Sequence, residues 1–214
     1  DNIKKVDKAS NGKIGYIYIP DMGPEGLNEF SRYFYPQLDK EGLILDDRAN
    51  GGGNVAPMIL ERLSREPYRL TMRRGSSLIG TVPDAVQVGP KVCLINKYSA
   101  SDGDLFPWGF RALGLGKLIG TRTWGGIIGI SGPLPYMDGT DIRVPFFTSY
   151  DPKTGNWIIE NHGVDPDILI DNDPIKEWNG EDQQLDRAIE EVMKQLKERK
   201  PLAPVPAPRD WSHK

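Results

Sequence analysis

The chain repeats one pattern: a short apolar run, a turn of small or polar residues, and then a stretch with helical spacing. The apolar runs at 43–47 and 91–96 both lead through such turns into helical stretches at 55–65 and 103–114. Strands that alternate with helices in this way are typical of a largely parallel sheet with helices packed against it. The sequence therefore predicts an α/β fold, a layered sheet with flanking helices.

The rest of the chain adds further elements to this pattern. The stretch 181–200 is the clearest helix, because Leu185, Ile189, Val192 and Leu196 form one apolar stripe. Residues 125–170 turn to glycine, proline and short strand-like runs, which predicts a more irregular, β-rich second half. We also expect strands at 13–19, 68–73, 77–82 and 117–120, and a helix at 27–38.

Length and local composition suggest how the chain is organised. A chain of 214 residues suffices for one large domain with a sizeable core. We expect that domain to span residues 13–200. Residues 1–12 are interpreted as a linker from missing upstream domains. Residues 201–214 are interpreted as a proline-rich arm, because closely spaced prolines cannot continue a helix.

Charge and cysteine content exclude some classes of function. The net charge of −3 provides no basic footprint for nucleic acid, and no apolar stretch reaches the 18 residues of a membrane span. The single cysteine, Cys93, rules out an internal disulfide. It lies within an apolar strand, so we interpret it as core packing. No cofactor or metal site is expected.

Ser101 is the first candidate for chemistry. It follows the apolar run at 91–96 within the segment Ser-Ala-Ser-Asp-Gly-Asp at 99–104, where a helix is expected to begin. A serine at such a strand-to-helix turn exposes its hydroxyl beside free backbone N–H groups, which suits a nucleophile and its oxyanion. The alternative is a serine that caps the helix, which is the commoner use of serine there.

Three consecutive glycines, Gly51, Gly52 and Gly53, follow the strand at 43–47. Without side chains, their backbone is open to close approach. Phosphate binding is one interpretation, but the segment lacks the Lys-Ser/Thr ending of a P-loop and the spacing of a dinucleotide site. A flexible turn is the other.

Three motifs in this order resemble a known family. They are Asp-x-Arg-x-Asn-Gly-Gly-Gly at 46–53, Ser-Ala-Ser-Asp-Gly-Asp at 99–104, and Glu-Asn-His-Gly-Val-Asp-Pro-Asp at 160–167. Together they resemble the tricorn-type serine peptidases, relatives of the carboxy-terminal processing peptidases. The resemblance runs from about Ile14 to the proline-rich tail. It implies a fold like that of the Clp protease and crotonase superfamily.

A serine peptidase needs a nucleophile, a base, a group that orients the base, and an oxyanion hole. We assign Ser101 as the nucleophile. The backbone N–H of Asp102 and one N–H from the glycine turn are expected to form the oxyanion hole; we favour Gly52, with the register among 51–53 open. The resemblance places the orienting carboxylate at Glu160. An apolar rim for binding peptide backbone is expected at Gly126, Ile127 and Ile128.

The general base is not evident in this chain. In the tricorn type, the resemblance implies a histidine from an upstream domain, within a Ser-His pair that does not occur here before residue 212. The related processing peptidases use a lysine, but the equivalent position holds Arg122, which stays charged and cannot accept a proton. His162 is either a substitute general base or simply a loop residue. His213 lies in the tail, next to the last residue.

We therefore expect the catalytic domain of a serine endopeptidase whose base comes from elsewhere, and an isolated fragment with little or no activity. A catalytically inactive peptide-binding scaffold and an acyl-CoA enzyme of the crotonase type are the alternatives. Expected partners are peptide substrates, a PDZ-like and a His-bearing domain of the same polypeptide, and further copies in a homo-oligomer. The resemblance favours the cytoplasm, with a periplasmic or secreted location left open.

Overall fold

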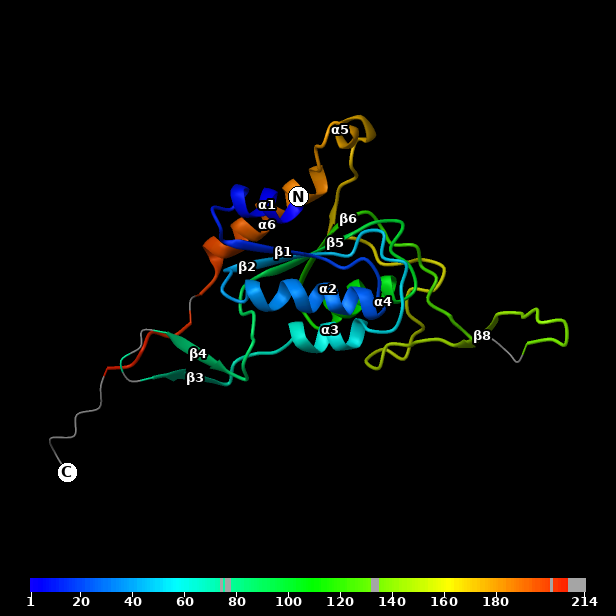
Figure 1. Cartoon of the computed structure of the whole chain (residues 1–214), viewed down its shortest axis with the longest axis horizontal. Helices are drawn as coiled ribbons and strands as arrows, with labels where there is room; N and C mark the ends of the chain where they lie inside the picture. Colours follow the sequence, from blue (N-terminus) through cyan, green and yellow to red (C-terminus); the bar gives the residue numbers. More distant parts are fainter. Residues whose placement is uncertain (74, 76–77, 132–134, 201, 208–214) are drawn as a thin grey trace, which may run out of the picture.

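The computed structural model describes all residues except 74, 76–77, 132–134, 201 and 208–214. At its centre is a five-stranded parallel sheet in the order β1-β2-β5-β6-β9 (Figure 1). The strands are β1 (Ile14–Tyr18), β2 (Gly42–Asp46), β5 (Lys91–Ile95), β6 (Gly116–Gly120) and β9 (Ile168–Leu169). The α/β prediction is therefore confirmed. β1, β2, β5 and β6 lie within two residues of their predicted positions, whereas β9 was not predicted as a separate strand.

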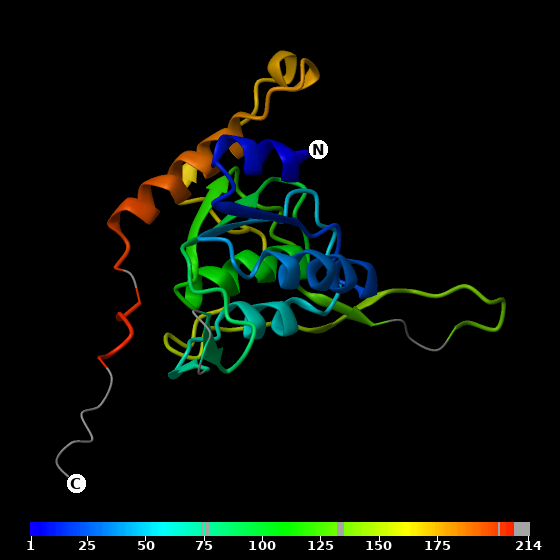
Figure 2. The same ribbon diagram turned by 60° about the vertical axis from the view of Figure 1, so that its left-hand side comes forward.

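Helices cover both faces of this sheet (Figures 1 and 2). One face carries α2 (Pro24–Phe34), a 3₁₀ turn η1 (Tyr35–Gln37), α3 (Ala56–Leu63) and α4 (Asp102–Ala112), and the other carries α1 (Asn2–Ala9) and α6 (Gln183–Glu198). Strand residues alternate between the two cores. Leu45 and Cys93 pack toward α2–α4, whereas Ile44 and Val92 pack toward α6. Continuous apolar runs are what a strand buried on both faces requires.

The first segment differs from the expected linker. Residues 2–9 form α1, whose Val6 is fully buried in the core shared with α6. Lys5 forms a salt bridge with Asp186 of α6, with 2.8 Å between Nζ and Oδ1. Because six of the first nine residues are polar or charged, one buried valine was too weak a sign of a helix. The division of the chain into domains stays a prediction.

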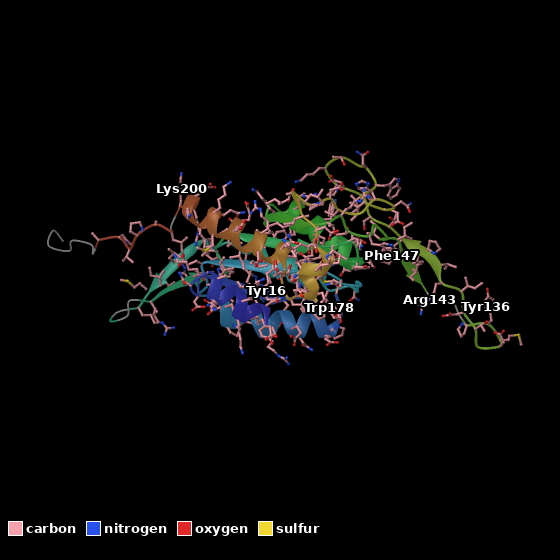
Figure 3. All side chains as sticks on the ribbon, turned by 90° about the horizontal axis from the view of Figure 1, so that it is seen from above. Tyr16, Tyr136, Arg143, Phe147, Trp178 and Lys200 are labelled. Carbon is pink, nitrogen blue, oxygen red and sulfur yellow. The ribbon has the colours of Figure 1, made fainter. Side chains whose placement is uncertain are left out.

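Two antiparallel hairpins project from the body. One pairs β3 (Arg69–Met72) with β4 (Ile79–Val82), and the other pairs β7 (Gly129–Ser131) with β8 (Val144–Phe147). In Figure 3 the second hairpin leads away from the body from Phe147 to Tyr136. Of the expected strand at 77–82, Ser77 lies outside the described residues. Residues 132–134 also lie outside the described residues; the rest of 125–170 holds short strands, turns and irregular segments, as predicted.

The remaining described segments are short. A small helix that the sequence analysis did not anticipate, α5 (Pro174–Trp178), begins where the carboxylate of Asp173 accepts from two backbone N–H groups. Residues 202–207 of the proline-rich arm form neither helix nor strand. Within the described ranges, no helix combines the length and apolar character needed to cross a membrane.

Strand order determines where the candidate site lies. β2 and β5 are parallel neighbours, with Asp46 beside Leu94 in the register. The turns that follow them therefore emerge at the same edge of the sheet, where ligands bind in open α/β folds. The glycine turn leaves β2 at this edge, and the Ser101 turn leaves β5 there.

Candidate active site

Ser101 occupies a strained turn at the start of α4. Its φ of 57° and ψ of −119° lie outside the ordinary regions for a residue with a side chain. Its side chain makes no capping hydrogen bond. Its carbonyl accepts from the N–H groups of Asp104 and Leu105, which fixes the turn from behind. Ser101 therefore occupies the N-cap position without using its hydroxyl as a cap, and its backbone resembles the sharp strand-to-helix turn that exposes a nucleophile.

The glycine turn lies directly against Ser101. A Cβ built on Gly52 would lie 2.6 Å from the Cβ of Ser101, 2.8 Å from the carbonyl oxygen of Ala100 and 3.0 Å from the nitrogen of Asp102. The backbone of Gly52 has a φ of +99°, which favours glycine. The N–H of Ala100 donates to the carbonyl of Asn50 at 2.8 Å. The two turns thus lie in direct contact, as an oxyanion hole shared between them requires.

Several backbone N–H groups at this contact are free. No described group accepts from the N–H of Asp102. The N–H of Gly52 donates to Oδ1 of Asn50 at 3.0 Å, whereas those of Gly51 and Gly53 have no acceptor among the described residues. The backbone N–H of Asp102 is therefore free to donate a hydrogen bond to an oxyanion. The register of the glycine donor stays a prediction, and Gly52 would have to exchange its present acceptor.

Two carboxylates behind the Ser101 turn hold neighbouring elements in place. Oδ2 of Asp102 accepts from the N–H of Ala56 at 3.0 Å and so caps α3. Oδ1 of Asp104 accepts from the N–H of Gly125 at 2.8 Å, and Oδ2 from that of Gly126 at 3.3 Å. Burial raises the pKa of both carboxyls. Asp104 was not predicted as a site residue, although its position three residues after Ser101 was a signal.

Glu160 lies beneath the expected peptide rim. Its Oε2 accepts from the N–H of Ile127 at 2.7 Å and from that of Ile128 at 3.0 Å. The Ile127 side chain is buried and that of Ile128 is exposed, so only part of the expected rim presents side chains to solvent. The N–H of Trp124 donates to the carbonyl of Ser99 at 2.9 Å, which ties this segment to the Ser101 turn.

His162 is directed elsewhere. Its Nε2 lies 2.7 Å from Oδ2 of Asp165, and it lines a hollow beside the C-terminal half of α4, including Trp108 and Leu113. Trp108 is seven residues beyond Ser101, which corresponds to about 10 Å along a helix. The structure therefore does not place this imidazole at the Ser101 hydroxyl. His213 lies outside the described residues.

The Asp-x-Arg motif forms a partly buried ionic cluster beside the site. Arg48 donates to both oxygens of Asp46, at 2.8 and 2.6 Å, and to both oxygens of Asp182 at the start of α6, at 2.9 and 2.8 Å. Burial opposes the ionisation of Asp182, but the hydrogen bonds and charge of Arg48 outweigh it and lower its pKa. The cluster fixes the end of β2, from which the glycine turn emerges.

The carboxyl group of Asp47 differs from the other polar groups around the site, because it forms no hydrogen bond with any described residue. It is fully buried, and neither carboxyl oxygen has a hydrogen-bond partner among the described residues. Burial, followed by the charge of Asp46, raises its pKa well above the ordinary value. Its backbone is nevertheless used, since its carbonyl accepts from the Ser99 hydroxyl at 2.8 Å. Among the described residues, no three His, Cys, Asp or Glu side chains are grouped to hold a metal ion.

Comparisons with known proteins identify the family of this chain. Peptidase family S41 matches residues 13–170. The tricorn protease of Thermoplasma volcanium is 43% identical over 93% of this chain and 19% of its own. A putative tricorn-like protease C-terminal subunit of Sulfurisphaera tokodaii is 42% identical over 92% of this chain and 23% of its own. The chain thus spans about a fifth of the length of these relatives.

Solved structures give the same result. The crystal structure of the tricorn protease superposes with a TM-score of 0.86 at 42% identity, covering 92% of this chain and 19% of that one. The photosystem II D1 C-terminal processing protease shares the fold, with a TM-score of 0.54 at 23% identity over 74% of this chain and 42% of that one. The chain belongs to peptidase family S41, and within it resembles the C-terminal peptidase region of tricorn proteases.

Proposed function

We propose that the complete polypeptide carrying this domain is a serine endopeptidase that cleaves peptides or unfolded chains through an acyl-enzyme. One observation carries the proposal: the uncapped, strained Ser101 lies against the backbone of Gly52. A capping serine would have no need of that strain or of a side-chain-free neighbour. The tricorn protease similarity supports the same assignment.

In the proposed reaction, Oγ of Ser101 attacks the scissile carbonyl carbon while a base takes its proton. The carbonyl oxygen becomes an oxyanion and accepts from the N–H of Asp102 and from one glycine N–H. The base then protonates the leaving amine as the peptide bond breaks. Water hydrolyses the resulting ester by the same steps and restores the serine.

We propose that the base is a histidine from an upstream domain of the same polypeptide. His162 faces Asp165, and Arg122 cannot accept a proton, so neither meets the requirement. Oε2 of Glu160 accepts from the peptide rim, whereas its Oε1 accepts from no donor among the described residues. Oε1 can therefore accept a hydrogen bond from a neighbouring group, and this supports the proposed role of Glu160 in orienting the histidine through that group.

The other proposals concern the setting. Peptide substrates would bind beside residues 126–128, the segment held by Glu160 and Asp104. By analogy with the tricorn type, we propose assembly into a homo-oligomer, contacts with PDZ-like and His-bearing domains, and a cytoplasmic location.

Peptide hydrolysis by the complete polypeptide tests this function. We expect Ser101→Ala to reduce turnover by several orders of magnitude, up to about 10⁶-fold. Ser64→Ala is the matched control, since that hydroxyl donates only to the Glu61 carbonyl at the surface. The isolated 214-residue chain should show little or no activity. If the isolated chain hydrolyses peptides and Ser101→Ala abolishes that activity, the base lies within the chain itself. If the complete polypeptide binds peptides without turnover, a scaffold is favoured.

A further inference from the structure

A charged hollow lies at the opposite edge of the sheet from Ser101. It has a volume of about 400 Å³ and lies between the end of α3, the start of β5 and the end of α6. In Figure 3 the end of α6 is marked by Lys200, far from Phe147 and the second hairpin. The charged residues that line it are Arg65, Glu66, Lys91, Arg199 and Lys200.

Lys91 is the unusual member of this group. Lys91 is the first residue of β5 and is only 8% exposed to solvent. Its Nζ donates to the carbonyls of Gln87 at 2.8 Å and Gly89 at 3.3 Å, and no described carboxylate lies within salt-bridge distance. A buried ammonium ordinarily has an anionic partner, because removing its charge from water is costly. Lys91 thus retains one N–H without a described acceptor, and the nearest favourable charge, that of Glu66, lies beyond salt-bridge distance.

The cations around Lys91 make its position harder to explain without an anion. Burial, and after it the charge of Arg199, lowers the pKa of Lys91 to about 8. Arg199 itself has no hydrogen-bond or salt-bridge partner among the described residues. Arg65 is neutralised by Glu61, with 2.9 Å between the charged groups. In a chain of net charge −3, such an excess of positive charge in one hollow indicates an anionic ligand.

We infer that this hollow binds a small oxyanion group, a phosphate or a carboxylate, between Lys91 and Arg199. Both cations donate charge-assisted hydrogen bonds of the kind that phosphate and carboxylate oxygens accept. β5 runs from Lys91 to Ile95, about 13 Å, before the turn that carries Ser101. The ligand is therefore remote from the proposed nucleophile, and this inference does not depend on the proposed peptidase activity.

Calorimetric titration of the complete polypeptide with inorganic phosphate, and separately with acetate, tests this site at constant ionic strength. We expect saturable binding of at least one anion. Lys91→Met and Arg199→Gln should each weaken it about tenfold or more, since each removes a charge-assisted contact. Lys13→Met is the control, because Lys13 is exposed and already paired with Glu41 at 3.4 Å.

Hydrogen exchange of residues 87–91 locates the binding and reports whether each variant is folded. Bound anion should slow exchange there in the wild type and leave it unchanged in Lys91→Met. Phosphate binding alone identifies a phosphate ligand, and acetate binding alone a carboxylate; both uphold the oxyanion site. Absence of saturable binding of either anion, or equal affinities in the wild type and both folded variants, overturns the inference.

Discussion

The contact between Gly52 and Ser101 leads to a sharp prediction for Gly52→Ala. The added Cβ would lie 2.6 Å from the Cβ of Ser101, whereas ordinary contacts begin at 3.4 Å. The two turns must therefore separate by about 0.8 Å, the difference of those two distances. A displacement of that size in a catalytic constellation can cost about 100-fold, and loss of an oxyanion donor costs about 10²–10³-fold. We expect kcat/KM to fall by about 10²–10³-fold.

Gly51→Ala is the matched control. A Cβ on Gly51 would meet no atom within 4 Å, and its φ is not in the left-handed region. We expect this variant to retain wild-type activity. The assay is peptide hydrolysis by the complete polypeptide, with circular dichroism to verify folding, because alanine at the φ of +99° also strains the backbone by about 1–2 kcal/mol.

Two results would refute this reasoning. A folded Gly52→Ala variant with unchanged kcat/KM would mean that the glycine turn takes no part in the reaction. Equal losses in Gly51→Ala and Gly52→Ala would mean that the turn matters for its flexibility and not for its contact with Ser101.

Three carboxylates give further predictions. The carboxyl of Asp47 keeps its proton to higher pH in the native protein than in the unfolded chain. The free energy of unfolding should therefore fall as the pH rises above about 4. The expected slope is about 1.4 kcal/mol per pH unit for as long as the native carboxyl stays neutral. Asp47→Asn removes this loss, so urea unfolding should show a larger gain over wild type at pH 7 than at pH 5; equal gains would contradict the protonated state. Asp104→Asn should speed hydrogen exchange at residues 123–128, since it weakens bonds worth about 1.5–3 kcal/mol to the N–H groups of Gly125 and Gly126; unchanged exchange would show that the segment is held otherwise. Glu160→Gln should lower kcat/KM about tenfold or more while leaving the overall fold intact, and wild-type kinetics would remove Glu160 from the site.

Much of the fold followed from local patterns. The runs that became β2 and β5 are apolar on both faces because helices cover both, and that makes them conspicuous in a sequence. Because these two strands are parallel neighbours, the glycine and Ser101 turns that follow them emerge at one edge of the sheet. α1 was missed because a polar helix held by one buried valine has little apolar pattern of its own.

Other features depend on contacts between distant residues, which no local pattern contains. The pairing of Arg48 with Asp182 spans 134 positions, and Asp104 reaches the backbone of Gly125 across 21. Glu160 was proposed only from a family motif, and its contacts with Ile127 and Ile128 exist only in the folded chain. The proposed general base also depends on a long-range contact, because the histidine is proposed to come from another part of the polypeptide.

Covalent labelling of the complete polypeptide with a fluorophosphonate tests the central claim most directly. We predict that peptide mapping by mass spectrometry finds the phosphonyl group on Ser101, and that Ser101→Ala abolishes the labelling while Ser64→Ala does not. Gly52→Ala should label far more slowly than Gly51→Ala. Labelling at another serine, or none in a polypeptide that hydrolyses peptides, would contradict the assignment of Ser101 as the nucleophile.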